Sequence, residues 1–306
     1  MSTVKALFLG RVFGNPFLLL TLTTLMWGGN TVAGRLAIGE VSPMVVVFLR
    51  WLIVSVVLVA LTHRQIAAEW KEIRPNLRKM VVMATFGFTG FNMLFYIAAH
   101  QTTAVNLGII QGSMPVLVLI GAVFAFGVRV RFLQICGILL TLAGVATVAA
   151  QGDLDILLAF SVNPGDGIML IASLFYAGYT LSLRNRPKVS GIVFFTVLSV
   201  AAAIMTLPGL AFEISRETEQ WPTTFGWGVV FYIALFPSCL AQIFFMRGVE
   251  IIGPARAGVF LNLVPIFAAV LAILILGEPF HIHHAVALAL VLGGIWLSER
   301  KSTPRP

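Results

Sequence analysis

The side chain with the most evident chemistry is Arg50, which follows Pro43 by seven residues inside a long apolar stretch. A helix that begins at Pro43 would carry Arg50 about 10 Å from its end, at a rise of 1.5 Å per residue. The planar guanidinium could bind a carboxylate through two parallel hydrogen bonds. Alternatively, the long side chain could extend to the lipid–water boundary or bind backbone carbonyls between helices.

A stripe of polar and aromatic side chains is expected in the third apolar stretch. Asn92 and Tyr96 are four residues apart, so a helix places them on one face, with Phe91 and Phe95 beside them. Such a stripe suits the wall of a polar pathway. For the two phenylalanines, packing against neighbouring helices is an equally simple interpretation.

In the first apolar stretch, Trp27 and Asn30 lie one turn apart. Gly28 and Gly29 between them would let a neighbouring helix approach closely. A buried amide must find hydrogen-bonding partners, which favours a cavity-facing position for Asn30. For Trp27, a cavity and helix packing remain open alternatives.

Two prolines mark further irregular points. Gln111 and Ser113 precede Pro115, and Asn262 precedes Pro265 at a corresponding depth. A proline frees a backbone carbonyl one turn earlier, so both points could border a cavity or could simply bend the helices. The residues expected to line a pathway are Trp27, Asn30, Arg50, Phe91, Asn92, Phe95, Tyr96, Gln111, Ser113, Tyr176, Tyr179, Ser238, Gln242, Met246 and Asn262.

Acidic residues are absent from the middle of the apolar stretches. Glu40, Asp166 and Glu278 fall near stretch ends, and Glu250 falls in a loop. Proton-coupled pumps commonly place a carboxylate or histidine at mid-membrane depth. The sequence therefore disfavours coupling through a central carboxylate.

A histidine-rich turn is the one motif that suggests metal chemistry. His281, His283 and His284 follow Glu278 closely, and imidazole and carboxylate groups bind zinc. No second ligand group accompanies them, and no nucleophile–base pair or phosphate-binding loop is evident. We therefore expect neither a metal nor another cofactor, and a membrane-embedded metal enzyme is a distant alternative.

The elements that position these residues follow from composition. The chain is 306 residues long, 59% hydrophobic and only 10% charged, against about a quarter charged in soluble domains. About 20 apolar residues span a bilayer as a helix. We predict an all-α polytopic membrane protein with ten transmembrane helices at 16–35, 43–62, 80–99, 104–126, 132–150, 165–183, 190–212, 224–246, 254–276 and 282–298.

The basic residues follow this layout. Seventeen of the 20 Lys and Arg residues fall in alternate loops and the two ends of the chain, whereas Arg35 and Arg216 fall on the opposite side. Cytoplasmic loops hold the excess of basic residues in membrane proteins. Topology thus accounts for the net charge of +8 without a nucleic-acid partner, and both termini are predicted to be cytoplasmic.

The two halves of the chain repeat each other. A shift of 150 positions places Gly108 on Gly258 and Pro115 on Pro265, among other small and helix-breaking residues. We predict two five-helix repeats, 16–150 and 165–298. Because five is odd, the second repeat has inverted topology, the construction of many secondary transporters.

The order of motifs supports a specific resemblance. Leu25-Met26-Trp27-Gly28-Gly29-Asn30 lies in the first predicted helix, Gly112-Ser113-Met114-Pro115 in the fourth, and Leu276-Gly277-Glu278-Pro279 at the end of the ninth. Together they resemble the drug/metabolite transporter (DMT) superfamily, EamA type. The resemblance implies ten helices and export of amino acids or other metabolites. One departure is Gly127-Val128-Arg129, where family members often have Gly-Glu; it argues against a symmetric role for Glu278, which is more simply a helix-end residue.

A narrower resemblance is to the bacterial exporters of aromatic amino acids of the YddG type. It implies alternating access in the bacterial inner membrane, with a small metabolite and the lipid bilayer as partners. Nucleotide-sugar or drug transport within the superfamily is the alternative, although phosphate groups would call for more basic residues than Arg50. A channel is disfavoured because no ring of like charges is evident. Oligomeric state is left open, with a monomer among the expectations.

Overall fold

The computed structural model describes residues 13–153, 155–156 and 163–299, and over these residues it contains helices and loops but no strand. Seven continuous helical segments are long and apolar enough to cross a membrane, and Ile282–Ser298 is a shorter apolar helix. The prediction of an all-α membrane protein is therefore confirmed. The seven segments are Pro43–Ala99, Ala104–Phe126, Phe132–Ala149, Pro164–Asn185, Gly191–Ser215, Thr224–Ile252 and Arg256–Leu276.

The segment ends agree with the sequence signals for helix starts. Prolines occupy the first turn of several helices, where their missing N–H groups cost nothing. The helices are α2 (Pro16–Leu36), α3 (Pro43–Ala84), α4 (Phe91–Ala99), α5 (Ala104–Gly112), α6 (Met114–Phe126), α7 (Phe132–Ala149), α9 (Pro164–Ser182), α10 (Gly191–Ser215), α11 (Thr224–Ile233), α12 (Ala241–Ile252), α13 (Pro254–Phe260), α14 (Leu263–Leu271) and α15 (Ile282–Glu299).

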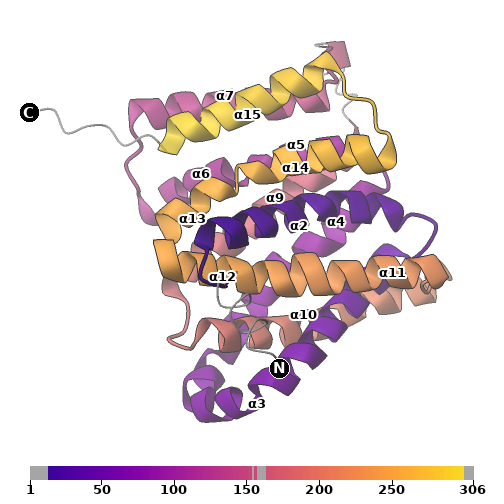
Figure 1. The fold of residues 1–306 in the computed structure, drawn as a ribbon, viewed down its shortest axis with the longest axis vertical. Coiled ribbons are helices and arrows are strands. Elements are labelled where there is room, and N and C mark those ends of the chain that lie inside the picture. Colours follow the sequence, from indigo (N-terminus) through magenta and orange to yellow (C-terminus); the bar gives the residue numbers. More distant parts are fainter. Residues whose placement is uncertain (1–12, 154, 157–162, 300–306) are drawn as a thin grey trace, which may run out of the picture.

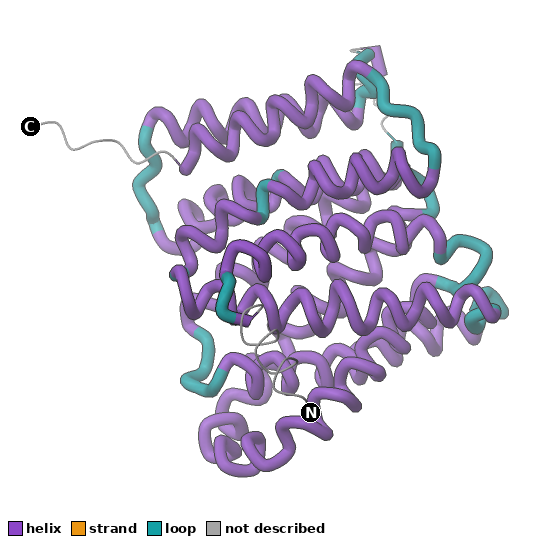
Figure 2. Tube along the Cα trace, viewed as in Figure 1, coloured by secondary structure: helices purple, strands orange, loops and turns teal. Residues whose placement is uncertain are grey.

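The helices lie roughly side by side in stacked layers, with the connecting loops gathered at two opposite ends (Figures 1 and 2). α7 packs against α15, and α3 packs against α10. Between these outer pairs, α2 packs on α14 and α12, while α9 packs on α5, α6 and α4. The contacts of α2 with the second half thus correspond to the contacts of α9 with the first half.

One predicted loop is helical. The sequence indicated a loop between residues 62 and 80, but α3 continues through it and is 42 residues long. Strong helix formers fill this segment, and Ile66 and Ile73 supply an apolar face; Ile73 is fully buried. A straight helix of this length would measure about 63 Å, twice the hydrocarbon thickness. The chain instead folds back on itself: η1 and α4, which follow α3, pack against it.

Two π-helical turns occupy corresponding positions in the two halves and were not predicted. They are η1 (Thr85–Gly90) and η3 (Ala234–Leu240). In η1, the Phe91 N–H donates to the Phe86 carbonyl five residues earlier, and the Ala241 N–H donates to the Phe236 carbonyl in the same way. Turns of this type are frequent at functional sites because they release a backbone carbonyl.

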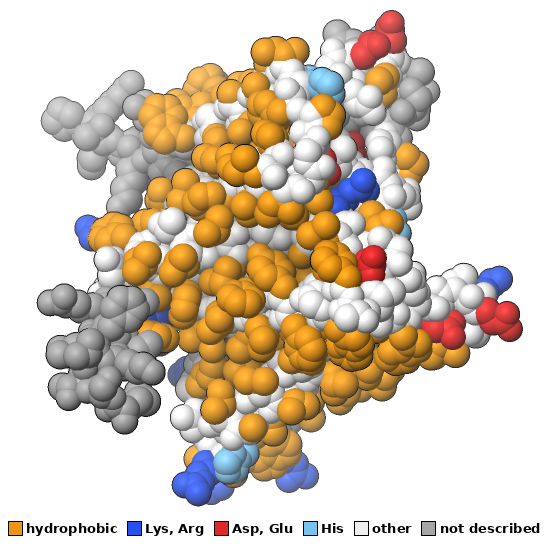
Figure 3. Space-filling model, turned by 45° about the vertical axis from the view of Figure 1, so that its right-hand side comes forward, with side chains coloured by type: hydrophobic (Ala, Val, Ile, Leu, Met, Phe, Trp, Pro, Cys, Tyr) orange, Lys and Arg blue, Asp and Glu red, His pale blue; other side chains and the backbone are white. Residues whose placement is uncertain are grey.

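The two ends of the bundle differ in charge. The acidic end comprises the loops at 37–42, 100–103, 150–153, 216–223 and 277–281, and the basic end comprises those at 127–131, 183–190 and 253 together with the middle of α3. Apolar side chains cover the broad surface between the ends (Figure 3). The terminal basic residues, Lys5, Arg11, Arg300, Lys301 and Arg305, lie outside the described residues.

Candidate functional site

A polar cluster forms in the interior of the bundle from α2, α3 and α4. The Nη1 atom of Arg50 donates to Asn92 Oδ1 at 2.5 Å and to the Tyr96 hydroxyl at 2.9 Å. The Tyr96 hydroxyl in turn donates to Asn30 Oδ1 at 3.0 Å. All four side chains are buried. We call Asn30, Arg50, Asn92 and Tyr96 the polar cluster.

The surrounding helices fix the geometry of this cluster. Pro43 begins α3, so Arg50 lies two turns below the acidic end. Asn92 Nδ2 donates to the Phe88 carbonyl at 2.5 Å, and Phe88 belongs to the π-helical turn η1. This bond holds the amide so that its oxygen faces the guanidinium of Arg50.

Arg50 carries a buried charge with no acidic partner among the described residues. Its side chain turns inward instead of reaching the lipid–water boundary, and its Nε atom has no hydrogen-bond partner. Removing an ion from water costs several kcal/mol unless a counter-charge and hydrogen bonds compensate. Neutral amide and hydroxyl acceptors compensate in part, so the site retains a capacity for an anion.

A row of aromatic rings extends from the polar cluster. The guanidinium of Arg50 lies 5.1 Å from the centre of the Trp51 ring, which stacks on Phe88 at 4.7 Å. Phe88 meets Tyr179 edge to face at 5.4 Å, and Tyr179 lies 5.6 Å from Tyr176. The row therefore joins the two tyrosines of α9 to the polar cluster.

Sequence reasoning missed Trp51 and Phe88, which make that connection. Two signals could have found them: Trp51 is the direct neighbour of Arg50, and Phe88 is four residues before Asn92. Phe91 adds a further ring, 5.3 Å from Tyr176. Phe95 is fully buried against the edge of Tyr96 at 5.1 Å, a packing position.

Other predicted pathway residues lie near η3. The indole N–H of Trp27 donates to the Pro237 carbonyl at 3.0 Å, and its ring lies 5.4 Å from Phe245. The Ser238 hydroxyl donates to the Ile233 carbonyl at 2.5 Å. Gln242 and Met246 follow on α12, and no contact described in the structure links them to the polar cluster.

The two proline sites interrupt their helices at related points. The break between α5 and α6 falls at Ser113, whose hydroxyl donates to the Ile110 carbonyl, and the break between α13 and α14 falls at 261–262. The Oε1 atom of Gln111 and the Oδ1 atom of Asn262 are buried without partners. Broken helices with unpaired polar atoms are typical of transporter centres.

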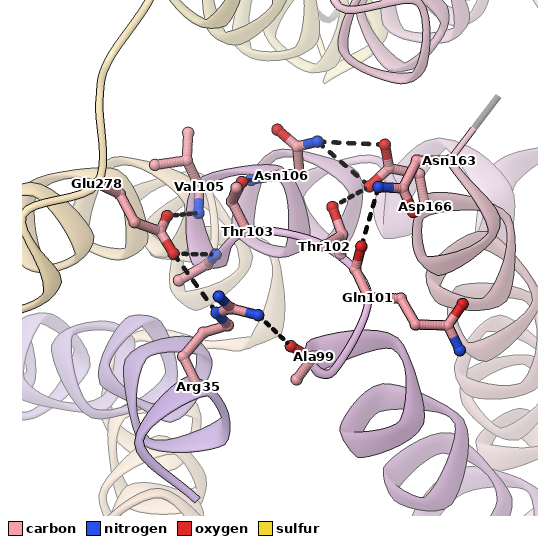
Figure 4. A network of polar contacts seen from close by, with 11 residues as sticks. Arg35, Ala99, Gln101, Thr102, Thr103, Val105, Asn106, Asn163, Asp166 and Glu278 are labelled. Atoms are coloured by element: carbon pink, nitrogen blue, oxygen red, sulfur yellow. Dashed lines mark hydrogen bonds and ion pairs between the residues drawn. The ribbon is translucent and has the colours of Figure 1, made fainter. Parts of the chain in front are cut away.

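At the acidic end, Glu278 crosses from one half of the chain to the other (Figure 4). Its carboxylate accepts hydrogen bonds from the Ala104 N–H at 2.9 Å and the Val105 N–H at 3.1 Å, which caps α5. Arg35 Nε lies 3.7 Å from the same carboxylate, and Arg35 Nη1 donates to the Ala99 carbonyl at 2.7 Å. The expectation of a simple helix-end residue misses this role, because the capped helix is distant in sequence.

Asp166 makes a second cross-connection at this end. Thr102 donates to its Oδ1 atom at 2.5 Å, and Asn106 Nδ2 donates to its Oδ2 atom at 3.1 Å. The nearby Asn163 amide donates to the Gln101 carbonyl. The turn before α5 is therefore held by carboxylates on both sides, as Figure 4 shows.

The histidines at this end make local contacts. The His281 N–H donates to His284 Nδ1 at 3.0 Å, and within the described residues no group of three or more His, Cys, Asp and Glu is placed to hold a metal ion.

His100 lies in the turn after α4. Partial burial of its ring lowers its pKa, and the positive charge of Arg35 lowers it further, whereas the charge of Glu213 raises it. His100 is therefore uncharged at neutral pH.

Comparison with known proteins decides the family. The model of the EamA-like transporter family matches residues 15–150 and again residues 163–300. The chain belongs to this family of transporters. The EamA part of the resemblance is thereby confirmed.

Relatives of this EamA protein are similar over most of their length. It is 28% identical to the uncharacterized transporter YetK of Bacillus subtilis over 90% of this chain and 83% of the relative. It is 24% identical to the uncharacterized inner membrane transporter YedA of Escherichia coli K12, over 89% and 87% of the two chains. One solved crystal structure superposes with a TM-score of 0.63 at 19% identity, covering 92% of this chain and 96% of the other, which supports the fold.

Proposed function

We propose that this EamA-family transporter exports small carboxylate-bearing metabolites, most specifically neutral and aromatic amino acids, across the bacterial inner membrane. The observation that carries the proposal is the buried Arg50 without an acidic partner. A carboxylate would supply the negative charge that is missing beside this guanidinium, and its two oxygens match the spacing of the guanidinium N–H groups. The substrate therefore completes the polar cluster when it binds.

The aromatic row supports the choice of an aromatic side chain. Five aromatic rings contact one another in a row that begins beside the guanidinium of Arg50: Trp51, Phe88, Tyr179, Tyr176 and Phe91. An apolar wall with a small number of placed polar groups is the common form of a small-molecule site. A zwitterion with an aromatic side chain matches both parts.

The proposed mechanism is alternating access between two inverted repeats, 16–150 and 165–298, with ten membrane crossings. Shared helix neighbours and the related π-helical turns in the two halves support this division. The ten crossings follow if α3 and α4 contribute two and α2 and α15 one each. By the excess of basic residues, the basic end faces the cytoplasm.

Uptake into proteoliposomes tests the function. Purified protein is reconstituted, and entry of radiolabelled L-phenylalanine and L-tryptophan is compared with entry of L-alanine, L-threonine, phenethylamine and a uridine diphosphate sugar. The proposal expects saturable entry of the aromatic amino acids and none of phenethylamine, which lacks the carboxylate. Entry of the nucleotide sugar alone would favour the other substrate class of the superfamily, and entry of phenethylamine at an equal rate would contradict a role for the carboxylate.

A further inference from the structure

A cavity of about 690 Å³ opens at the acidic end, apart from the polar cluster. Its lining includes Arg35 from the end of α2, His100 and Asn106 from the two sides of the α4–α5 turn, and His281 and His283 from the start of the last helix. Such a volume accommodates a small organic molecule. Family membership does not by itself assign a role to this cavity.

The first notable feature of the cavity is the guanidinium of Arg35. Arg35 supplies a guanidinium with five N–H donors, and no Asp or Glu is among the described residues that line the cavity. The neighbouring Glu278 forms an ion pair with Arg35 Nε at 3.7 Å and accepts the N–H groups of Ala104 and Val105. The described contacts of Arg35 use its Nε and Nη1 atoms, so the Nη2 atom remains for a ligand.

The second feature is an unpaired acceptor. Asn106 is only 7% exposed, its amide nitrogen is engaged by Asp166, and its Oδ1 atom is buried without a partner. An unsatisfied buried oxygen costs about 1–3 kcal/mol in proteins, so such atoms usually serve a ligand or a water molecule. The negative charge of Asp166 beside it favours a positively charged donor.

The third feature is the position of the cavity relative to the polar cluster. Arg35 follows Asn30 by five residues on α2, and Ala99, whose carbonyl holds Arg35, follows Tyr96 by three residues on α4. Arg35 therefore lies about 7 Å from the polar cluster along the same helix pair. Arg35 is the next charged side chain of α2 from the cluster toward the acidic end.

We propose that this cavity is a second amino-acid binding site on the exit side, with the ligand carboxylate at Arg35 and its ammonium group at the Asn106 oxygen. The proposal rests on the proposed function for its ligand class. The Arg35 guanidinium on one side and the Asn106 oxygen, with Asp166 behind its amide, on the other favour a zwitterion over a simple anion or cation. The site receives substrate from the polar cluster before release.

Protection of an introduced cysteine tests this site. The variant Gln101→Cys places a thiol in the lining, in a background where Cys136→Ala and Cys239→Ala remove the native thiols. In proteoliposomes, its reaction with the neutral reagent N-ethylmaleimide is timed with and without L-phenylalanine, 3-phenylpropionate or phenethylamine. We expect L-phenylalanine to slow the reaction about tenfold at saturation, with less protection by the other two at equal concentration, since each makes one polar contact.

Matched variants localise the protection. Arg35→Gln should abolish protection by L-phenylalanine and Arg35→Lys should retain part of it, whereas Arg216→Gln, at an exposed arginine of the same end, should change nothing. Thr218→Cys, exposed on a neighbouring loop, should show no protection. Equal protection by all three compounds, or protection that survives in Arg35→Gln, overturns the inference.

The central site is separated from this cavity by one further variant. Arg50→Gln should lower transport of L-phenylalanine about ten- to a hundredfold but leave protection of Gln101→Cys intact. Loss of protection in Arg50→Gln would mean that the cysteine reports binding at the central site, and the proposal of a second site would be wrong. Protection without transport in the unmodified protein would count against the proposed function and not against the cavity.

Discussion

The outer pair of helices, α3 and α10, is held by glutamates at both ends of the molecule. At the acidic end, Glu213 accepts hydrogen bonds from the Ser42 hydroxyl at 2.6 Å and the Met44 N–H at 3.1 Å, at the start of α3. At the basic end, Glu69 accepts the N–H of Ser190 at 2.8 Å, at the start of α10. In each contact, a glutamate of one helix of the pair binds the start of the other helix.

The inner helices are held at one end only. Glu278 caps α5 at the acidic end, directly after Gly277, whose φ is 65°. The corresponding Gly127 has a φ of 62°, but Val128 follows it, and α13 begins at Gly253 without a side-chain cap. The backbone is therefore repeated while the capping carboxylate is not.

This difference teaches that backbone symmetry does not make the two ends equivalent. The cap made by Glu278 across the two halves must break before the acidic end can separate. Among the described residues, the inner helices have no such cap at the basic end. The structure thus predicts that the acidic end is the harder of the two to open. Three substitutions test that difference, beginning with the largest expected effect on stability or transport.

Removing the cap should be the costliest change in stability. Glu278→Ala leaves the Ala104 and Val105 N–H groups unpaired and Arg35 without its carboxylate, so the free energy of unfolding should fall by about 1–3 kcal/mol. Chemical denaturation in mixed micelles measures it. Glu250→Ala, at an exposed basic-end carboxylate, is the control and should change the value by less than about 0.5 kcal/mol. Equal losses in the two variants would remove the special role of Glu278.

Adding the missing carboxylate should make the two ends more alike. Val128→Glu places a carboxylate at the position that corresponds to Glu278 in the other repeat, so by the symmetry of the halves it should reach the start of α13. A negative charge near a helix N-terminus contributes about 0.3–1 kcal/mol. The basic end should then open less readily, and initial transport should slow. Val128→Gln separates the charge from the change in size, and an unchanged or faster rate in Val128→Glu would contradict the comparison.

The exposed basic-end contact of the outer pair should matter least. Glu69→Gln keeps the shape and loses the charge that accepts the Ser190 N–H, and a solvent-exposed contact of this type contributes about 0–1 kcal/mol. The midpoint of denaturation should therefore shift only slightly. A loss as large as that of Glu278→Ala would show that the two ends are held equally.

Much of the fold follows from the sequence because apolar runs and prolines mark helix ends locally. The predicted segments 104–126 and 132–150 agree with the structure to within a residue. The sequence does not predict the helical continuation of α3, because the many charged residues between 62 and 80 are typical of a loop between membrane helices. The spacing of Ile66 and Ile73 is nevertheless that of one helix face. The π-helical turn η3 has a local signal in Pro237, which disrupts regular helical hydrogen bonds, whereas η1 contains no proline.

The candidate site was predictable in its members but not in its contacts. Asn30, Arg50, Asn92 and Tyr96 each stood out as polar groups in apolar helices, yet their pairing joins three helices. Glu278 was interpreted as a local helix-end residue because its partners are more than 170 positions away. Spacing along one helix can identify a face, but it cannot identify the helix opposite.

The central claim is that Arg50 binds the substrate carboxylate, and one measurement tests it most directly. Uptake of L-phenylalanine by Arg50→Gln should fall about ten- to a hundredfold in kcat/KM, the effect of a lost charged hydrogen bond. Arg216→Gln, at an exposed arginine, should transport normally. An Arg50→Gln protein that is folded and monodisperse yet transports L-phenylalanine at the unmodified rate would contradict the account.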